Sequence, residues 1–366
     1  MAHGSGTPRR LGPGDARGMQ ARAIGLGRAN PPLSYTQDEI LEKLGITDGR
    51  VGSVFRNSHI ERRFLYLPES DPAKPEGEGD LLARHKTYGI QLALQAMEDC
   101  LAKAGAKKNE VRYLCCVTST GWLTPGLSAF LIKQWGIPVD CGRIDVVGMG
   151  CNGGLNGLSA VVSWALSHPG EIAVLVCVEI CSAAYVLDGS MSTAVVNSLF
   201  GDGAAALAVC ASAESDAAPG AGPKMLEFSS RLIPEAISAM RYDWDDLQNK
   251  FSFFIDPDIP YVIGANIELA VDALLSDRLR RSEISHWLVH PGGKKVIDAV
   301  RVNLGLGTYD LRHTIAVLRR YGNLSSGSFL FAFQNLLDEG SARPGDFGVM
   351  VTMGPGSTIE TALLQW

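Results

Sequence analysis

Cys151 stands in a setting that favours nucleophilic chemistry. It lies in GMGCNGGLNGLSA (residues 148–160), between a mostly apolar run at 144–147 and a segment with helical spacing. Glycines permit a tight turn and the close approach of a substrate, and a helix N-terminus offers unpaired N–H groups and a positive dipole end. Such surroundings lower the pKa of a cysteine, whose thiolate is the reactive form. The sequence therefore predicts a nucleophilic thiol at a strand-to-helix turn.

His290 and Asn323 are the polar residues that could serve this thiol. His290 ends the apolar run 287–289 and precedes a Pro-Gly-Gly turn and a helical segment, which repeats the arrangement around Cys151. Asn323, in YGNLSSGSFLFAF, also stands just before an apolar helical segment. A histidine at a strand end is more often structural, but its repeated setting makes His290 the preferred partner for the thiol.

The elements that must position these residues alternate between strand and helix. Apolar runs predict strands at 23–26, 112–117, 144–147, 172–178, 204–209, 287–289 and 347–353. Helical spacing is found at 35–44, 88–104, 155–166, 262–275, 296–304 and 328–337. An Ala/Ser/Pro/Gly-rich linker at 211–224 separates two sets of such elements, which predicts two similar α/β halves, 21–212 and 225–366. A Gly/Pro/Arg-rich arm, residues 1–20, is predicted to be disordered.

Composition excludes several other classes of function. The 366 residues carry a net charge of −6, which argues against nucleic-acid binding, and no window is long and apolar enough for a membrane span. The eight cysteines form no CxxC pair and follow no signal peptide, so we expect free thiols in the cytoplasm and no metal site.

At Cys151, His290 and Asn323 the sequence resembles the thiolase-fold condensing enzymes, and specifically the type III polyketide synthases of the chalcone synthase superfamily. The motifs AIGLGRANPP, IERRFLYL, LFGDGAAA, HPGG, YGNLSSG and MGPG carry this resemblance in order along nearly the whole chain after the arm. The resemblance implies an α/β thiolase-like fold with two similar αβαβα halves. It also implies a homodimer with CoA thioesters as substrates and no resident cofactor.

The same resemblance implies a mechanism. Cys151, paired with His290, takes an acyl group from an acyl-CoA as a covalent thioester. His290 and Asn323 then stabilise the enolate that forms when malonyl-CoA loses CO₂, and this enolate attacks the acyl-Cys carbonyl. Such a decarboxylative Claisen condensation lengthens the chain by two carbons. Malonyl-CoA is the expected substrate, and whether another acyl-CoA supplies the starter is left open.

Family positions also imply the residues that bind substrate. Two phenylalanines that gate the site fall on Phe200 and on Phe253, with Phe254 as the alternative for the second. The cavity residues fall on Ser325, Cys181, Ala184, Thr120 and, in the closing MGPG loop, Gly354. The CoA phosphates need nearby bases, for which we expect Arg50 and Arg56, within a basic cluster that includes Arg62 and Arg63 and is supplemented by Lys294 and Lys295.

Departures from the plant pattern narrow the range of starters and products that we expect. Cys181 and Ala184 replace cavity threonines of plant chalcone synthases, and Met353 replaces a phenylalanine, which disfavours a cinnamoyl-type starter. The segments GCNGGLNGL, EICSAAYV and TAVVNSLFGDGAA are similar to those of bacterial 3,5-dihydroxyphenylacetyl-CoA synthases, which use malonyl-CoA as starter and extender. A tetrahydroxynaphthalene-, alkylresorcinol- or pyrone-forming synthase is the alternative.

Other readings of the chain remain open. A ketoacyl-ACP synthase III-like enzyme would use the same three residues, whereas a thiolase would need a second cysteine near the C-terminus, and the last cysteine is Cys210. A catalytically silent scaffold would not need the intact trio. A redox sensor would need a resolving thiol near Cys151, for which Cys181 is the candidate.

Overall fold

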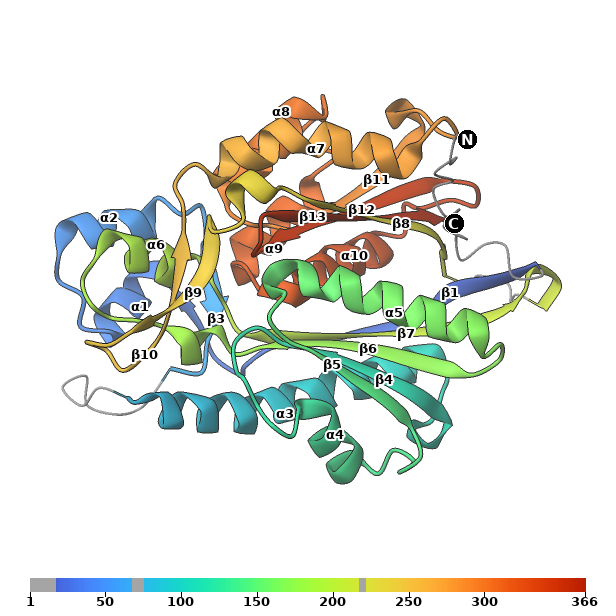
Figure 1. Ribbon diagram of the computed structural model, residues 1–366, viewed down its shortest axis with the longest axis horizontal. Coiled ribbons are helices and arrows are strands. Elements are labelled where there is room, and N and C mark those ends of the chain that lie inside the picture. Colours follow the sequence, from blue (N-terminus) through green and yellow to red (C-terminus); the bar gives the residue numbers. More distant parts are fainter. Residues whose placement is uncertain (1–17, 68–75, 217–221) are drawn as a thin grey trace, which may run out of the picture.

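Five layers of helix and sheet form the chain in the computed structural model, which describes residues 18–67, 76–216 and 222–366. Figure 1 shows two layers of strands, with helices between them and on both outer faces. Residues 1–17 of the predicted arm lie outside the described residues. The first strand begins at Met19, so the prediction of disorder was wrong for residues 19 and 20.

The strands of both layers belong to one sheet within the described residues, in the order β11-β12-β13-β8-β1-β7-β6-β4-β5. Their bounds in chain order are β1 (Met19–Ala29), β4 (Val111–Val117), β5 (Gly142–Val146), β6 (Ile172–Glu179), β7 (Gly203–Ala213), β8 (Lys224–Leu232), β11 (Ile284–Val289), β12 (Phe347–Gly354) and β13 (Thr358–Gln365). The pairing between β1 and β8 is confined to Arg22 and Lys224, so the sheet is continuous but narrow at that point. Two short antiparallel pairs complete the strands, β2 (Ser34–Thr36) with β3 (Arg62–Phe64) and β9 (Met240–Asp245) with β10 (Lys250–Ile255).

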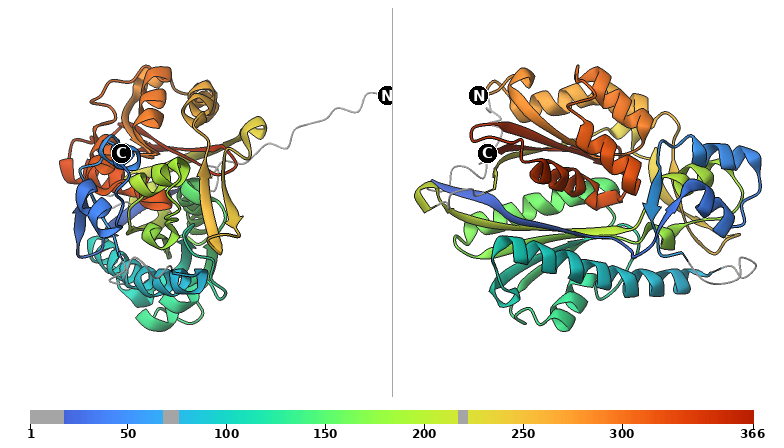
Figure 2. Two further views of the ribbon diagram at one scale, coloured as in Figure 1. Left: turned by 90° about the vertical axis from the view of Figure 1, so that its left-hand side faces the viewer. Right: turned by 180° about the vertical axis from the view of Figure 1, so that it is seen from behind.

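The helices sort by the layer that they cover. Their bounds are α1 (Gln37–Lys43), α2 (Gly49–Arg56), α3 (Glu78–Ala104), α4 (Leu127–Trp135), α5 (Gly153–Ser167), α6 (Met191–Leu199), α7 (Ile259–Leu275), α8 (Lys294–Asn303), α9 (Arg312–Tyr321) and α10 (Ser328–Glu339). Helices α3 and α4 cover one outer face, α7 and α8 cover the other, and α5 and α10 lie between the two strand layers (Figures 1 and 2). Helices α1, α2 and α6 gather with the β9–β10 hairpin at one end of the layers (Figure 1).

The central layer explains why the segments that follow Cys151 and Asn323 have the sequence pattern of apolar helices. A helix between two sheets must be apolar on nearly all sides. Accordingly, α10 buries Phe329, Phe331 and Phe333 completely, and α5 buries Leu158, Val161 and Val162. Cys151 and Asn323 each lie a few residues before one of these helices. Burial of the two helices in the central layer therefore fixes the positions of the turns that carry both residues.

The structure confirms the predicted strands and helices and adds several that the patterns did not indicate. These are strands β2, β3, β8, β9, β10 and β13 and helices α2, α4, α6 and α9. The predicted linker 211–224 was partly wrong, because β7 extends to Ala213 and β8 starts at Lys224. None of the helices in the described part of the chain is long and apolar enough to cross a membrane.

Candidate active site

The turn that carries Cys151 links β5 to α5. Cys151 lies in a single 3₁₀ turn, Gly150–Asn152, and α5 begins two residues later at Gly153. Gly150 has φ +63°, and a Cβ added to it would lie 2.3 Å from the ring of Pro355. Only glycine fits this position, because both its backbone angle and the adjacent proline exclude a side chain.

The closing MGPG loop forms the other side of this turn. Gly354 ends β12, and a Cβ added to it would lie 2.4 Å from Asn152 Oδ1 and 3.0 Å from the Cys151 backbone nitrogen. Gly354 was predicted to be a cavity residue, but it does not line the pocket; its missing side chain lets the loop pack directly against the turn that carries Cys151.

The Cys151 thiol is nearly buried, with 7% of the residue exposed, and its Sγ lies 3.5 Å from Ser325 Oγ. Burial raises the pKa of the thiol to about 12, while hydrogen bonds from Ser325 and Asn323 act in the opposite direction. The predicted lowering of this pKa was wrong, because the desolvation of a thiolate outweighs the turn and its dipole.

His290 follows β11 and is 1% exposed. Its backbone N–H donates to the Val351 carbonyl at 2.8 Å, which places it beside β12 just before the MGPG loop. Its Nδ1 has no hydrogen-bond partner among the described residues, and no hydrogen bond there joins its ring to the Cys151 sulfur. Burial lowers the pKa of the imidazole to about 3, so His290 is a neutral base.

Asn323 follows α9 and links the gate to the thiol. Its backbone pairs with Phe200 through an isolated β-bridge. Its Oδ1 accepts a hydrogen bond from the Ser325 N–H at 2.8 Å, so the donors of this side chain are those of the amide NH₂. A hydrogen bond from this side chain acts to lower the Cys151 pKa. Asn323 can therefore donate to an oxygen that develops charge beside the sulfur.

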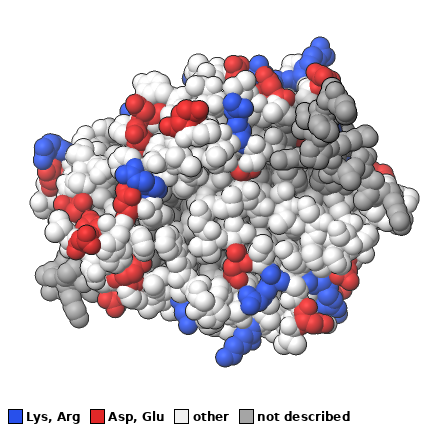
Figure 3. Space-filling model, in the orientation of Figure 1, with Lys and Arg blue, Asp and Glu red and all other residues white. Residues whose placement is uncertain are grey.

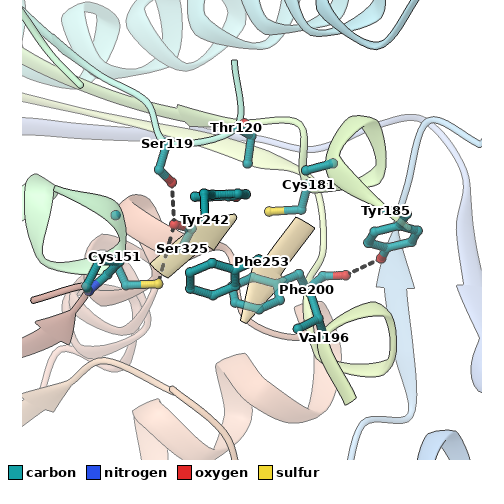
Figure 4. A pocket seen from close by; sticks show the side chains of 13 residues that line it. Ser119, Thr120, Cys151, Cys181, Tyr185, Val196, Phe200, Tyr242, Phe253 and Ser325 are labelled. Atoms are coloured by element: carbon teal, nitrogen blue, oxygen red, sulfur yellow. Dashed lines mark hydrogen bonds between the residues drawn. The ribbon is translucent and has the colours of Figure 1, made fainter. Parts of the chain in front are cut away.

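Seven of the predicted site residues line one pocket, of about 410 Å³ including space open to solvent. They are Cys151, Phe200, Phe253, Ser325, Cys181, Ala184 and Thr120 (Figure 4). The rings of Phe200 and Phe253 meet edge to face with centroids 5.9 Å apart, whereas Phe254 packs under the Arg241 guanidinium. The structure thus favours Phe253 over Phe254. His290, Asn323 and Gly354 are not part of this lining.

The structure places three of the predicted bases on the surface. Arg50 and Arg56 are exposed on α2, where they pair with Asp48 and Asp38. Lys294 pairs with Asp298 on α8. All three lie on the surface outside the pocket.

Arg63 was wrongly grouped with the surface bases, because it is fully buried. Its guanidinium donates to the Phe200 and Asn197 carbonyls, each at 2.6 Å, and to the Tyr185 hydroxyl at 2.8 Å. Burial lowers the pKa of this group. Arg63 thus holds the backbone of the gate.

Glu179 is a site residue that the sequence patterns did not indicate. It ends β6, is fully buried, and accepts hydrogen bonds from Ser119 Oγ and Thr120 Oγ1, each at 2.9 Å, and from Ser326 Oγ at 2.5 Å. Ser119 Oγ lies 2.8 Å from Ser325 Oγ, so a chain of hydroxyls connects this carboxyl to the Cys151 thiol (Figure 4). Burial raises the pKa of Glu179. A charged residue at the end of an otherwise apolar strand was the signal for it.

The fold and the site define a class of enzyme. Residues 54–219 match the family description "FAE1/Type III polyketide synthase-like protein", and residues 228–366 match "Chalcone and stilbene synthases, C-terminal domain". A solved structure of PKS-I from the brown alga Ectocarpus siliculosus superposes with a TM-score of 0.87 over 96% of this chain and 99% of its own, at 24% identity. This likeness confirms the thiolase-like fold.

Two curated relatives are much more similar in sequence. A 3,5-dihydroxyphenylacetyl-CoA synthase from Streptomyces toyocaensis is 59% identical over 94% of this chain and 90% of its own length. One from Amycolatopsis orientalis is 58% identical over 94% and 93%, respectively. The chain therefore belongs to the type III polyketide synthases, enzymes that extend acyl chains by condensation, and the predicted family is confirmed.

Proposed function

We propose that this enzyme makes 3,5-dihydroxyphenylacetyl-CoA with malonyl-CoA as both starter and extender. The observation that carries this product is the high identity, across nearly the whole length, to relatives that bear that name. The replacement of cavity threonines by Cys181 and Ala184 also supports it, because both residues line the pocket around Cys151.

Loading begins at Cys151. As its sulfur attacks the thioester carbonyl of malonyl-CoA, the thiol proton passes to the neutral His290, and the carbon–sulfur bond to CoA breaks. The proton then leaves with the CoA thiolate. Burial favours the neutral form of both groups before the attack.

Extension uses His290 and Asn323 as donors. The thioester carbonyl of a second malonyl-CoA accepts hydrogen bonds from both side chains, which stabilise the enolate left when the carbon–carbon bond to CO₂ breaks. The enolate carbon attacks the acyl-Cys carbonyl, and the cysteine sulfur departs. Decarboxylation itself produces the carbanion, so we propose that no resident cofactor or metal takes part.

The atom balance of the product follows from this step. Four malonyl-CoA give a linear eight-carbon tetraketide thioester, three CoA and four CO₂. Attack of the terminal carbon on the carbonyl nearest the thioester methylene, with loss of one water, yields the dihydroxyphenylacetyl ring. The gate rings Phe200 and Phe253, which meet edge to face in the pocket, would exclude water from this chain.

Arg50 and Arg56 remain our proposal for contacts with the CoA phosphates. Both lie on α2, which packs against α6, and α6 ends at the gate residue Phe200. Exposure leaves their guanidinium groups able to exchange an aspartate for a phosphate.

We also propose that the enzyme is a homodimer in the cytoplasm. The middle of the face in Figure 3 carries few charged side chains, which gather instead at its rim. Strand β5 is the last strand of the sheet, and at this edge Ile144 in the strand and Val147 just after it are exposed. A second copy would cover such an edge. Light scattering should give about twice 39.1 kDa, and Val147→Asp should shift the mass toward the monomer.

The test of the product is incubation with malonyl-CoA alone, followed by mass spectrometry. A dihydroxyphenylacetyl thioester or its hydrolysed acid is the expected result. A naphthalene, resorcinol or pyrone product would support the alternative synthases instead. No polyketide without an added acyl-CoA or an acyl carrier protein would contradict the malonyl-only proposal.

A further inference from the structure

A second pocket adjoins the one that contains Cys151. It has about 380 Å³, including space open to solvent, and its outer walls come from α3, β10 and the loop after β4. Leu81, Leu82, Trp122 and Phe251 make most of its lining apolar, and Glu78 lies at its edge. This chemistry suits an alkyl or ketide chain rather than a phosphate.

The two pockets share four residues: Ser119, Thr120, Ala184 and Tyr242. Hydrogen bonds to Glu179 hold Ser119 and Thr120 in place, and Ala184 contributes only a methyl group. Tyr242 is thus the large side chain of the shared wall.

Ring packing alone holds Tyr242. Its centroid lies 4.8 Å from that of Phe253, and Trp122 approaches its ring edge-on at 6.3 Å. Burial and nearby charges raise the pKa of its hydroxyl, and no hydrogen bond contributes to this shift. Figure 4 shows the ring between Ser119 and Phe253, at the edge of the space next to the Cys151 sulfur.

We propose that Tyr242 is a partition that keeps the acyl chain on Cys151 out of the second pocket and so limits its length. This inference rests on the proposed function, in which a growing chain is bound to Cys151. Each further condensation would add two carbons, consume one malonyl-CoA and release one CO₂ and one CoA. The ring of Tyr242 occupies the space that those carbons need.

Acyl loading tests the partition independently of the natural product. The purified enzyme is incubated with hexanoyl-, decanoyl- or tetradecanoyl-CoA, and the acyl-enzyme is measured by intact mass. In this step the Cys151 sulfur gains the acyl carbon, the bond to the CoA sulfur breaks, and the thiol proton ends on CoA. Tyr242→Ala should raise the ratio of long-chain to short-chain acyl-enzyme about tenfold or more over the wild type.

Trp244→Ala is the matched control. Trp244 lies two residues along the same strand and packs against Phe251, but it lines neither pocket. Its loss should leave the ratio unchanged. Tyr242→Leu replaces the alanine variant if thermal unfolding shows that the latter does not fold, because it also shortens the wall. An unchanged ratio in the folded Tyr242 variant would overturn the partition.

A second substitution tests where the longer chain goes. Leu82→Phe fills the far pocket from α3, so Tyr242→Ala with Leu82→Phe should return the ratio toward the wild-type value. A ratio that stays high would overturn the route through the second pocket. With malonyl-CoA, Tyr242→Ala should release products longer than those of the wild type. Failure of the wild type to make any polyketide from malonyl-CoA would contradict the proposed function alone, since the loading ratio still tests Tyr242.

Discussion

The turns after β5 and β11 carry Cys151 and His290, and they present these residues differently. The Cys151 turn contains Gly148 and Gly150 at positive φ, lies against Pro355 and directs its sulfur into the pocket. The His290 turn contains Gly293 at φ +128°, and its buried imidazole is not part of the pocket lining. The first half of the chain thus presents the predicted nucleophile Cys151 to the pocket, and the second half supplies the buried imidazole of His290.

Burial explains the opposite directions in which the pKa values of Cys151 and His290 are shifted. Both groups are buried, and burial favours the neutral form of each, so it raises the pKa of the thiol and lowers that of the imidazole. Burial therefore acts against a thiolate–imidazolium pair at both residues.

Cys151→Ala removes the sulfur that faces the pocket, and we expect it to abolish polyketide formation and acyl-enzyme formation. Product analysis and intact mass after incubation with malonyl-CoA measure both. Cys181→Ala is the matched control, because Cys181 lines the same pocket and has a pKa raised well above its ordinary value. A Cys151→Ala enzyme that turns over normally would remove the nucleophile assignment.

His290→Gln and Asn323→Ala each remove one of the two proposed hydrogen-bond donors to the enolate. We expect decarboxylation of malonyl-CoA to slow by about 10²–10³-fold in each, the size of effect found for a lost oxyanion donor. Release of CO₂ from carboxyl-labelled malonyl-CoA gives the rate. Decarboxylation at the wild-type rate would exclude the residue concerned from the enolate site.

Gly150→Ala tests the close packing of the Cys151 turn. The added methyl group would meet Pro355 and displace the sulfur, for which we expect a loss of turnover of about 10²-fold. Gly148→Ala is the control, because Gly148 also has positive φ but no atom lies within 4 Å of an added Cβ. It should cost only the backbone strain, about 1–2 kcal/mol in the free energy of unfolding. Equal turnover in the two variants would contradict the packing argument.

The pH dependence of alkylation tests the protonation of Cys151 in the absence of substrate. Because the Cys151 pKa is raised to about 12, the thiolate fraction should grow with every unit of pH between 6 and 9, and iodoacetamide should react faster throughout this range. Peptide mass spectrometry follows the label on Cys151. Ser325→Ala removes a hydrogen bond that lowers this pKa, so it should slow the reaction further. A rate that levels off below pH 8 would indicate a stable ion pair with His290.

The parts of the site that the sequence predicted are those with local signals. Cys151 and His290 each follow an apolar strand and precede a glycine turn, and these features depend only on neighbouring residues. Phe200 and Phe253 came from the family resemblance, and the structure brings them together from opposite sides of the linker.

The missed residues depend on contacts between distant segments. Arg63 was taken for a surface base because its neighbours are charged, yet its burial follows from the approach of Tyr185 and Phe200. Tyr242 became part of a wall only when the β9–β10 hairpin was placed beside Thr120. Likewise β13 has a mixed pattern, and its position between β12 and β8 decides that it is a strand.

The most direct test of the account is to locate the growing chain. The enzyme is mixed with malonyl-CoA, quenched with acid during turnover and digested, and the cysteine peptides are analysed by mass spectrometry. We predict acyl increments on the peptide with Cys151 and none on the peptide with Cys181. Increments on Cys181, or turnover without any acylated peptide, would contradict the assignment of Cys151 as the residue that carries the chain.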